Sequence, residues 1–247
     1  MMEFYRLLRG EFLKQKKSLT WPISLFAPIL AGGLSFINLL IRYDYLMGLE
    51  ANQGLSSWNL LLFQHHFMWF IFLPLVVTVI AWMVHYIEFK SGGLKNTLAL
   101  PVSKKKVYLA KWALVFILSS IMIIINGFVL LLVGIALRFP EAVDFILILK
   151  YSLYQIIGIL SLISLQTLIS AGINNTNIAL AMGFVGVASS LFFAQSEKLA
   201  KLIPYAHIIF TLPDPTINNH IPIQYGLSLG MAFLLIGLIY FNRKEIC

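Results

Sequence analysis

Long apolar runs without charge constrain this chain more than any other feature. Between Trp112 and Leu137, for example, no Asp, Glu, Lys or Arg occurs. A helix needs roughly 20 mostly apolar residues to cross the hydrocarbon core of a bilayer, which is about 30 Å thick. Only 11% of the 247 residues are charged and 60% are hydrophobic, whereas about 25% of residues are charged in soluble domains. The sequence therefore predicts an all-α protein that crosses the membrane several times.

The spacing of the apolar runs predicts six transmembrane helices and leaves no room for a second, soluble domain. Before them we expect a helix over residues 2–17, because apolar residues recur every four positions from Phe4 to Phe12 while Arg6 and Arg9 fall on the opposite face. Such a helix lies in the membrane interface; a plain basic flank is the alternative. The single membrane domain is expected to cover residues 1–247, with spans near residues 19–41, 66–87, 107–137, 145–173, 178–193 and 221–241.

The distribution of basic residues predicts the orientation of the chain. Most of the 18 Lys and Arg residues gather at the two ends and in the loop between the second and third spans. Cytoplasmic loops of membrane proteins carry an excess of Lys and Arg. We therefore expect a multi-pass protein of the plasma membrane with both termini in the cytoplasm. The positive charge is assigned to orientation and to contacts with membrane lipids, not to nucleic acid.

The loop between the second and third spans contains charged residues together with glycine and proline, which change the direction of the backbone or end a helix. Gly92 and Gly93 permit a sharp turn. Residues 94–100 can then form a short helix that ends before Pro101, because proline restricts the residue before it. Such a helix, held by Gly and Pro, could pass a push from outside into two spans at once, although an ordinary basic loop is the alternative.

The start of the third span carries an unusual concentration of positive charge. Ser103 is expected to be its N-cap, and three lysines, Lys104 to Lys106, then occupy the first turn. The helix dipole disfavours cations at that position by about 0.3–1 kcal/mol each. An anionic neighbour is therefore expected, either lipid phosphate or an acidic partner surface.

These segments resemble those of ABC-2 type permeases. Glu88-Phe-Lys-Ser-Gly-Gly-Leu-Lys95, followed by Pro101-Val-Ser-Lys104 and a downstream Lys111, is similar to the family's cytoplasmic loop, with Gly93 where Thr is common. The stretch from Glu11 to Ser18, Glu-Phe-Leu-Lys-Gln-Lys-Lys-Ser, resembles the family's opening before the first span, and the basic-acidic stretch 242–246 resembles its usual end.

The resemblance implies the transmembrane subunit of an ATP-driven exporter. Its partners would be two copies of an ATP-binding subunit, which hold ATP and Mg²⁺, and a second copy or a related permease in the membrane. The chain itself would bind no cofactor and would not be an enzyme, and the sequence contains no Gly-x-x-x-x-Gly-Lys-Ser/Thr phosphate loop. The residues implied in coupling to the ATPase are Glu88, Lys90, Gly92, Gly93, Leu94, Lys95, Leu98, Pro101, Ser103 and Lys104, together with Glu11, Lys14 and Lys17 of the interfacial helix.

A narrower resemblance concerns the cargo. Trp58, the run Trp69-Phe-Ile-Phe-Leu-Pro74 and Tyr86-Ile-Glu-Phe-Lys90 look like permeases of lantibiotic-immunity and bacitracin-resistance transporters. This likeness implies export of a peptide antibiotic from the membrane. Export of another drug, a lipid or a glycan is the alternative, and a proton-driven secondary transporter or a membrane scaffold that moves nothing remains open.

Polar residues inside the spans have two interpretations. Asn38, Asn126, Gln155 and Gln166 could line a cargo path, but hydrogen bonding between helices is the favoured interpretation.

Two further features carry no firm function. Gln64, His65 and His66 are expected at the outer mouth of the second span, as an interfacial polar cluster in preference to a metal site. The only cysteine, Cys247, excludes an internal disulfide and a cysteine-based metal site.

Overall fold

The computed structural model describes residues 2–91, 102–173 and 175–244, which form helices joined by turns. Six helical stretches are long and apolar enough to cross a membrane, which confirms the predicted all-α fold with six spans. The expected helix over residues 94–100 lies outside the described residues. The longer helices are α1 (Met2–Lys14), α2 (Thr20–Met47), α3 (Ser57–Ser91), α5 (Lys104–Ala136), α6 (Phe145–Gly172), α7 (Thr176–Phe193) and α9 (Gly226–Arg243). Short helical segments are η1 (Glu50–Asn52), α8 (Glu197–Ala200), η2 (Pro204–Thr211) and η3 (Ile221–Tyr225), the last continuing into α9.

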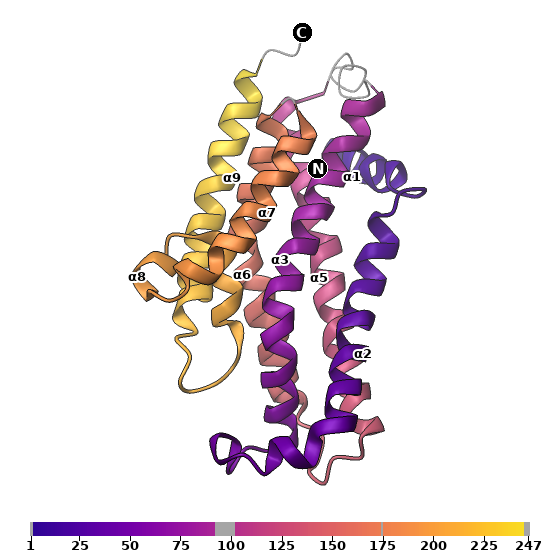
Figure 1. Ribbon diagram of the computed structural model, residues 1–247. Helices are drawn as coiled ribbons and strands as arrows, with labels where there is room; N and C mark the ends of the chain where they lie inside the picture. Colours follow the sequence, from indigo (N-terminus) through magenta and orange to yellow (C-terminus); the bar gives the residue numbers. More distant parts are fainter. Residues whose placement is uncertain (1, 92–101, 174, 245–247) are drawn as a thin grey trace.

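The helices form one elongated bundle (Figure 1). Helix α2 packs on α3 and α5, while α6 packs on α5 and α9, and α7 packs on α3. At about 1.5 Å per residue, α3 is roughly 50 Å long, whereas α7 and α9 are each roughly 27 Å long. Figure 1 accordingly shows α7 and α9 ending part of the way along the bundle. Helix α1 and the last turn of α9 lie at the same end, as an even number of spans requires.

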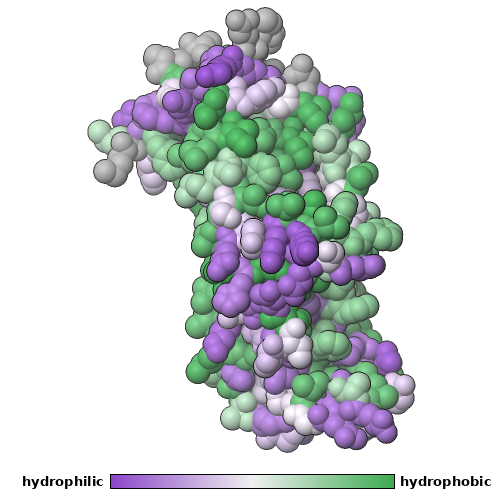
Figure 2. Space-filling model, turned by 90° about the vertical axis from the view of Figure 1, so that its left-hand side faces the viewer, coloured by the Kyte–Doolittle hydropathy of each residue, from purple (hydrophilic) through white to green (hydrophobic). Residues whose placement is uncertain are grey.

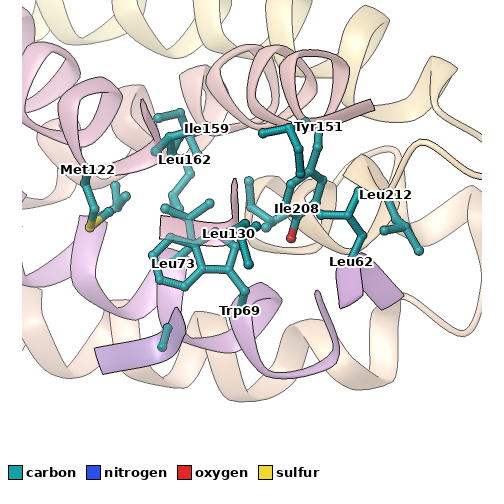
Figure 3. Packing of buried hydrophobic residues seen from close by; sticks show 14 of the residues in the cluster. Leu62, Trp69, Leu73, Met122, Leu130, Tyr151, Ile159, Leu162, Ile208 and Leu212 are labelled. Atoms are coloured by element: carbon teal, nitrogen blue, oxygen red, sulfur yellow. The ribbon is translucent and has the colours of Figure 1, made fainter. Parts of the chain in front are cut away.

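The apolar core runs along the axis between α3, α5 and α6 (Figure 3). Trp69 and Leu73 of α3 face Leu130 of α5 and Leu162 of α6, and all four are fully buried. The Trp69 indole nitrogen donates to the Gln155 side-chain oxygen of α6 at 3.1 Å, so the largest core residue also satisfies its polar atom.

Helices α6 and α9 approach each other at two glycines. A Cβ atom on Gly226 would lie 2.9 Å from the Ile157 carbonyl oxygen, and one on Gly230 would lie 3.1 Å from backbone atoms of Leu160 and Ser161. Small residues spaced four apart let membrane helices pack closely. Here that spacing serves a contact within the chain.

This contact yields a first stability prediction. The Gly226→Ala variant should unfold at lower temperature than the wild type in detergent, because overpacking against backbone typically costs about 1–3 kcal/mol. The matched control is Gly33→Ala in α2, where a Cβ atom meets nothing within 4 Å. That control should gain about 0.5–1 kcal/mol from the better helix propensity of alanine. Equal responses of the two variants would contradict the described α6–α9 packing.

Two helix boundaries differ from the sequence prediction. Helix α2 continues to Met47, past Arg42 and Asp44, and α3 already begins at Ser57. Hydropathy detects only the part of a helix that suits lipid, so the polar extension of α2 is missed. The apolar start of α3 is separated from the expected span by the polar residues Gln64, His65 and His66. The Tyr43 hydroxyl and Ser57 Oγ, 2.7 Å apart, join the two extensions.

His65 and His66, which were expected in an interfacial polar cluster, are buried between helices. Both residues lie more than two turns inside α3, with exposed fractions of 0% and 6%. His66 Nε2 lies 3.0 Å from the Ile209 carbonyl oxygen and Nδ1 lies 3.1 Å from the Tyr151 hydroxyl. Because a carbonyl only accepts, Nε2 carries the hydrogen and Nδ1 accepts from Tyr151. His66 therefore ties α3 to α6 and to η2.

The segment between α7 and α9 turns back into the bundle. Segment η2 is mostly buried, including Tyr205 and His207. Non-helical backbone is tolerated at membrane depth only where protein groups satisfy it. Asn219 Nδ2 donates to the carbonyl oxygens of Phe210 and Leu212 at 2.8 Å each, and His207 lies 2.8 Å from Ser161 Oγ. The sequence predicts a loop over residues 196–220, with prolines at 204, 213 and 215, and does not reveal this inward course.

Candidate functional site: a ring of buried charges

Four charged side chains form a closed ring of ion pairs at the end of the bundle that carries α1. Glu11 and Lys14 come from α1, Glu88 from α3 and Lys111 from α5. The Glu11 carboxylate pairs with Lys14 Nζ at 2.7 Å and with Lys111 Nζ at 2.8 Å. The Glu88 carboxylate pairs with Lys111 Nζ at 2.7 Å and also with Lys14. Each carboxylate thus contacts both ammonium groups, and we call these four residues the charge ring.

Three members of the charge ring are closed to solvent, and the Lys14 side chain is 32% exposed. Glu11 and Glu88 are each 3% exposed, and Lys111 is 2% exposed. Removing a charge from water costs several kcal/mol, which attraction repays only where partners are close and complete. Two negative and two positive groups, each with two partners, meet that condition. Since a buried ion pair adds little net stability, the ring chiefly fixes where α1 sits on α3 and α5.

Lys14 stays protonated in this setting. Burial acts to lower the pKa of Lys14, but attraction by Glu11 and Glu88 outweighs it and holds the pKa above its ordinary value. A group whose pKa is raised on folding stabilises the folded state below its unfolded pKa and loses that effect as pH rises through the folded pKa. The ring is therefore complete at neutral pH, and Lys14 weakens it only in strongly alkaline solution.

Further contacts fasten α1 along its length. Near its start, Glu3 pairs with Lys106 and accepts a hydrogen bond from the Ser103 backbone nitrogen at 3.2 Å. The hydrogen bond from Lys106, and then that from Ser103, lower the pKa of the Glu3 carboxyl. Near its end, the Phe12 ring lies 6.1 Å from the Trp21 ring of α2. Helix α1 is thus held to α5 at two points and to α2 and α3 at one each.

The lysines at the start of α5 have partners within the chain. Lys106 pairs with Glu3, and Lys104 Nζ donates to the Lys244 carbonyl oxygen at 2.9 Å. Lys105 is exposed. The anionic neighbour expected from the sequence is therefore supplied, for one of the three, by α1. Ser103 directly precedes α5 as expected, but its side chain makes no capping hydrogen bond.

The structure brings together some of the sequence-predicted coupling residues and separates others. Glu11, Lys14 and Glu88 meet in the ring, whereas Lys17 and Lys90 are exposed. Lys111, part of the loop motif, was missed as a contact residue. The sequence does contain a signal for such a contact. Glu11 and Lys14 share one face of α1 with the apolar residues Leu7 and Leu8, and a charge on an apolar face needs a buried partner. The remaining predicted coupling residues, Gly92, Gly93, Leu94, Lys95, Leu98 and Pro101, lie outside the described part of the chain.

The polar residues of the spans bond to neighbouring segments. Gln166 donates to the Ala179 carbonyl oxygen at 3.0 Å and accepts from the Tyr205 hydroxyl at 2.7 Å. Asn38 Nδ2 lies 3.4 Å from Gln64 Oε1, linking α2 to α3. Gln155 accepts from Trp69, and Asn126 is 1% exposed. These contacts suit helix packing. Over residues 2–91, 102–173 and 175–244, no group of three or more His, Cys, Asp or Glu side chains is placed to hold a metal ion.

Six candidate spans place the chain among multi-pass membrane proteins, with its ionic contacts gathered at the end that carries α1. Residues 7–190 match the family described as ABC-2 family transporter protein, and the chain belongs to that family. It is a permease subunit, of the kind that pairs with ATP-binding subunits and binds no cofactor itself. The matched region contains all four residues of the charge ring. No curated protein matches this chain.

Proposed function

We propose that the charge ring passes mechanical work from an ATP-binding subunit into the spans of this permease. The observation that carries this proposal is that the ring bonds α1 to both helices flanking residues 92–101. A displacement of that segment moves the ends of α3 and α5. Because Glu88 pairs with Lys14, Lys111 pairs with Glu11, and Glu88 and Lys111 pair with each other, α1 and the two helix ends move as one body.

The proposal extends to the orientation and the assembly. Both termini and residues 92–101 face the cytoplasm, as the distribution of Lys and Arg supports. Two ATP-binding subunits act on a pair of permeases, either two copies of this chain or this chain with a related one. ATP-driven closure presses on the segment around Leu98 and on α1, and the spans tilt.

We propose a peptide antibiotic of lantibiotic or bacitracin type as the cargo, expelled from the membrane to confer immunity or resistance. The support is the resemblance of residues 69–74 and 86–90 to permeases of that group. The test is to express the permease with its ATP-binding subunit in sensitive cells and to measure inhibitory concentrations of a lantibiotic and of bacitracin. Protection that requires ATP hydrolysis is expected, and unchanged sensitivity to both compounds would reject this cargo class.

A variant in the loop tests the docking of the ATPase. Replacing Lys95 and Leu98 together, as Lys95→Glu and Leu98→Ser, should abolish co-purification of the ATP-binding subunit while the protein still inserts into the membrane. The matched control, Lys198→Glu with Leu199→Ser on α8, changes an exposed Lys and an exposed Leu elsewhere. Normal recovery of the ATP-binding subunit with the Lys95 and Leu98 variant would refute the docking role.

A further inference from the structure

A pocket of about 700 Å³ opens between the start of α6 and residues 213–223, far from the charge ring. Its lining includes Lys150 and Tyr154 of α6, and Asp214 and His220 of the turn-back segment. Figure 2 shows the face that carries α8 and α9, where a hydrophilic patch at mid-height is separated by an apolar zone from the hydrophilic end of the molecule. The pocket lining mixes polar side chains such as Lys150 and Asp214 with apolar ones such as Ile146 and Ile223.

The depth of the pocket matches the headgroup layer of a bilayer. Helix α9 ends at Arg243 and begins at Gly226. Its length of roughly 27 Å is close to the hydrocarbon thickness of about 30 Å. The helix that ends at Arg243 therefore separates that residue from Ile223, which lines the pocket, by about the thickness of the hydrocarbon core. Along α6, Lys150 is about 33 Å from Gly172, a distance that is again close to the hydrocarbon thickness.

The charges in the pocket do not neutralise one another. Among the described residues, no carboxylate lies within 4.0 Å of Lys150. Asp144 Oδ1 accepts from the Leu147 nitrogen at 2.9 Å, and Asp214 Oδ1 accepts from the Thr216 nitrogen at 2.8 Å. The second oxygen of each carboxylate accepts no hydrogen bond from the described part of the chain. The pocket therefore offers one ammonium group and two carboxylate oxygens to a ligand.

Apolar side chains continue from the pocket toward the hydrocarbon layer. Leu153 of α6 is 47% exposed, and Leu227 and Met231 of α9 are 50% and 60% exposed. Helices α6 and α9 pack side by side, and these exposed residues lie within about two turns of the pocket residues Lys150 and Ile223 along the chain. A ligand that fits both features has a headgroup with both charges and an apolar tail.

We propose that this pocket binds the headgroup of a zwitterionic phospholipid with a primary amine, as in phosphatidylethanolamine. Lys150 contacts the phosphate, and the free oxygens of Asp144 and Asp214 accept hydrogen bonds from the ammonium group. The acyl chains lie along the surface formed by Leu153, Leu227 and Met231. The site is independent of the charge ring and of the cargo.

Lipid binding to the purified protein in detergent tests this proposal. Native mass spectrometry gives apparent affinities for phosphatidylethanolamine, phosphatidylglycerol and soluble glycerophosphoethanolamine. The wild type should bind phosphatidylethanolamine about tenfold more tightly than phosphatidylglycerol, since one charge-assisted contact is worth about that factor. Equal or tighter binding of phosphatidylglycerol would overturn the zwitterion assignment. Equally tight binding of the soluble headgroup would overturn the assignment to lipid.

Two variants separate the contribution of the Lys150 ammonium group from that of the Asp214 carboxylate. Lys150→Gln should weaken binding of both phospholipids about tenfold, because both carry the phosphate. Asp214→Asn keeps an acceptor oxygen for the Thr216 turn and should lower only the preference for phosphatidylethanolamine. The controls Lys198→Gln and Asp44→Asn remove exposed charges outside the pocket and should change neither affinity. Unchanged binding in Lys150→Gln, or equal losses in the controls, would contradict the site.

Discussion

Replacing Lys111 by methionine should lower the free energy of unfolding by about 3–5 kcal/mol, the largest stability loss that we expect for a single substitution in this chain. Lys111 is 2% exposed and contacts Glu11 and Glu88 at 2.8 and 2.7 Å. Methionine fills a similar volume, so packing is largely kept. Two buried carboxylates then share Lys14 alone, and one negative charge is left uncompensated. Thermal or denaturant unfolding in detergent measures the loss.

A second substitution should recover most of that stability. In the double variant Glu88→Gln with Lys111→Met, the Glu11–Lys14 pair at 2.7 Å remains and the buried charges balance. A buried pair replaced as a whole is often nearly neutral, whereas a broken pair is costly. If the double variant is as unstable as Lys111→Met, the loss arises from packing and the described ring energetics are wrong.

Removing the ion pairs that hold α1 should reduce transport more than tenfold without unfolding the bundle. The variant Glu11→Gln with Lys14→Gln removes both α1 members of the ring and leaves the Glu88–Lys111 pair at 2.7 Å. Helix α1 then no longer holds the ends of α3 and α5 through charge, so work done on α1 does not reach the spans. Protection of sensitive cells against the proposed antibiotic cargo measures transport, and co-purification with ATPase assays verifies that the ATP-binding subunit is still bound and active.

The control for this effect is Arg6→Gln with Arg9→Gln, which removes two exposed charges from the same helix. If α1 acted only by attracting anionic lipid, the control would lose transport as well, at about 1 kcal/mol of membrane attraction per basic residue. We expect the control to keep transport. Equal losses in the two variants would assign α1 a role in lipid attachment only.

The sequence predicts the spans well because hydropathy reports a local property. The third span was expected at residues 107–137 and α5 covers Lys104–Ala136. The start of α3 at Ser57 was missed because the polar residues Gln64, His65 and His66 interrupt the apolar run that begins at Trp58. The inward course of η2 was also missed, since its polar anchors, such as His66 with the Ile209 carbonyl oxygen, are 143 positions apart in the chain.

The charge ring was predictable from the sequence only in part. Three of its residues were singled out from the sequence, but as surface contacts for a partner. Charged residues in a short basic helix are usually solvated, and the sequence alone does not show that Lys111, 100 positions from Glu11, reaches it. In the folded chain, three segments that are far apart in the sequence, those of Glu11, Glu88 and Lys111, come together as one site.

We propose that the ring transmits nucleotide-driven movement to the spans. The direct measurement is the distance between spin labels at Asp44→Cys and Phe145→Cys, both exposed and near the end of the bundle away from α1, with the only cysteine replaced as Cys247→Ser. The permease with its ATP-binding subunit is compared before and after trapping with ATP and vanadate. The distance should shift when the ring is intact and stay constant in Glu11→Gln with Lys14→Gln. The same shift in both proteins would contradict the claim.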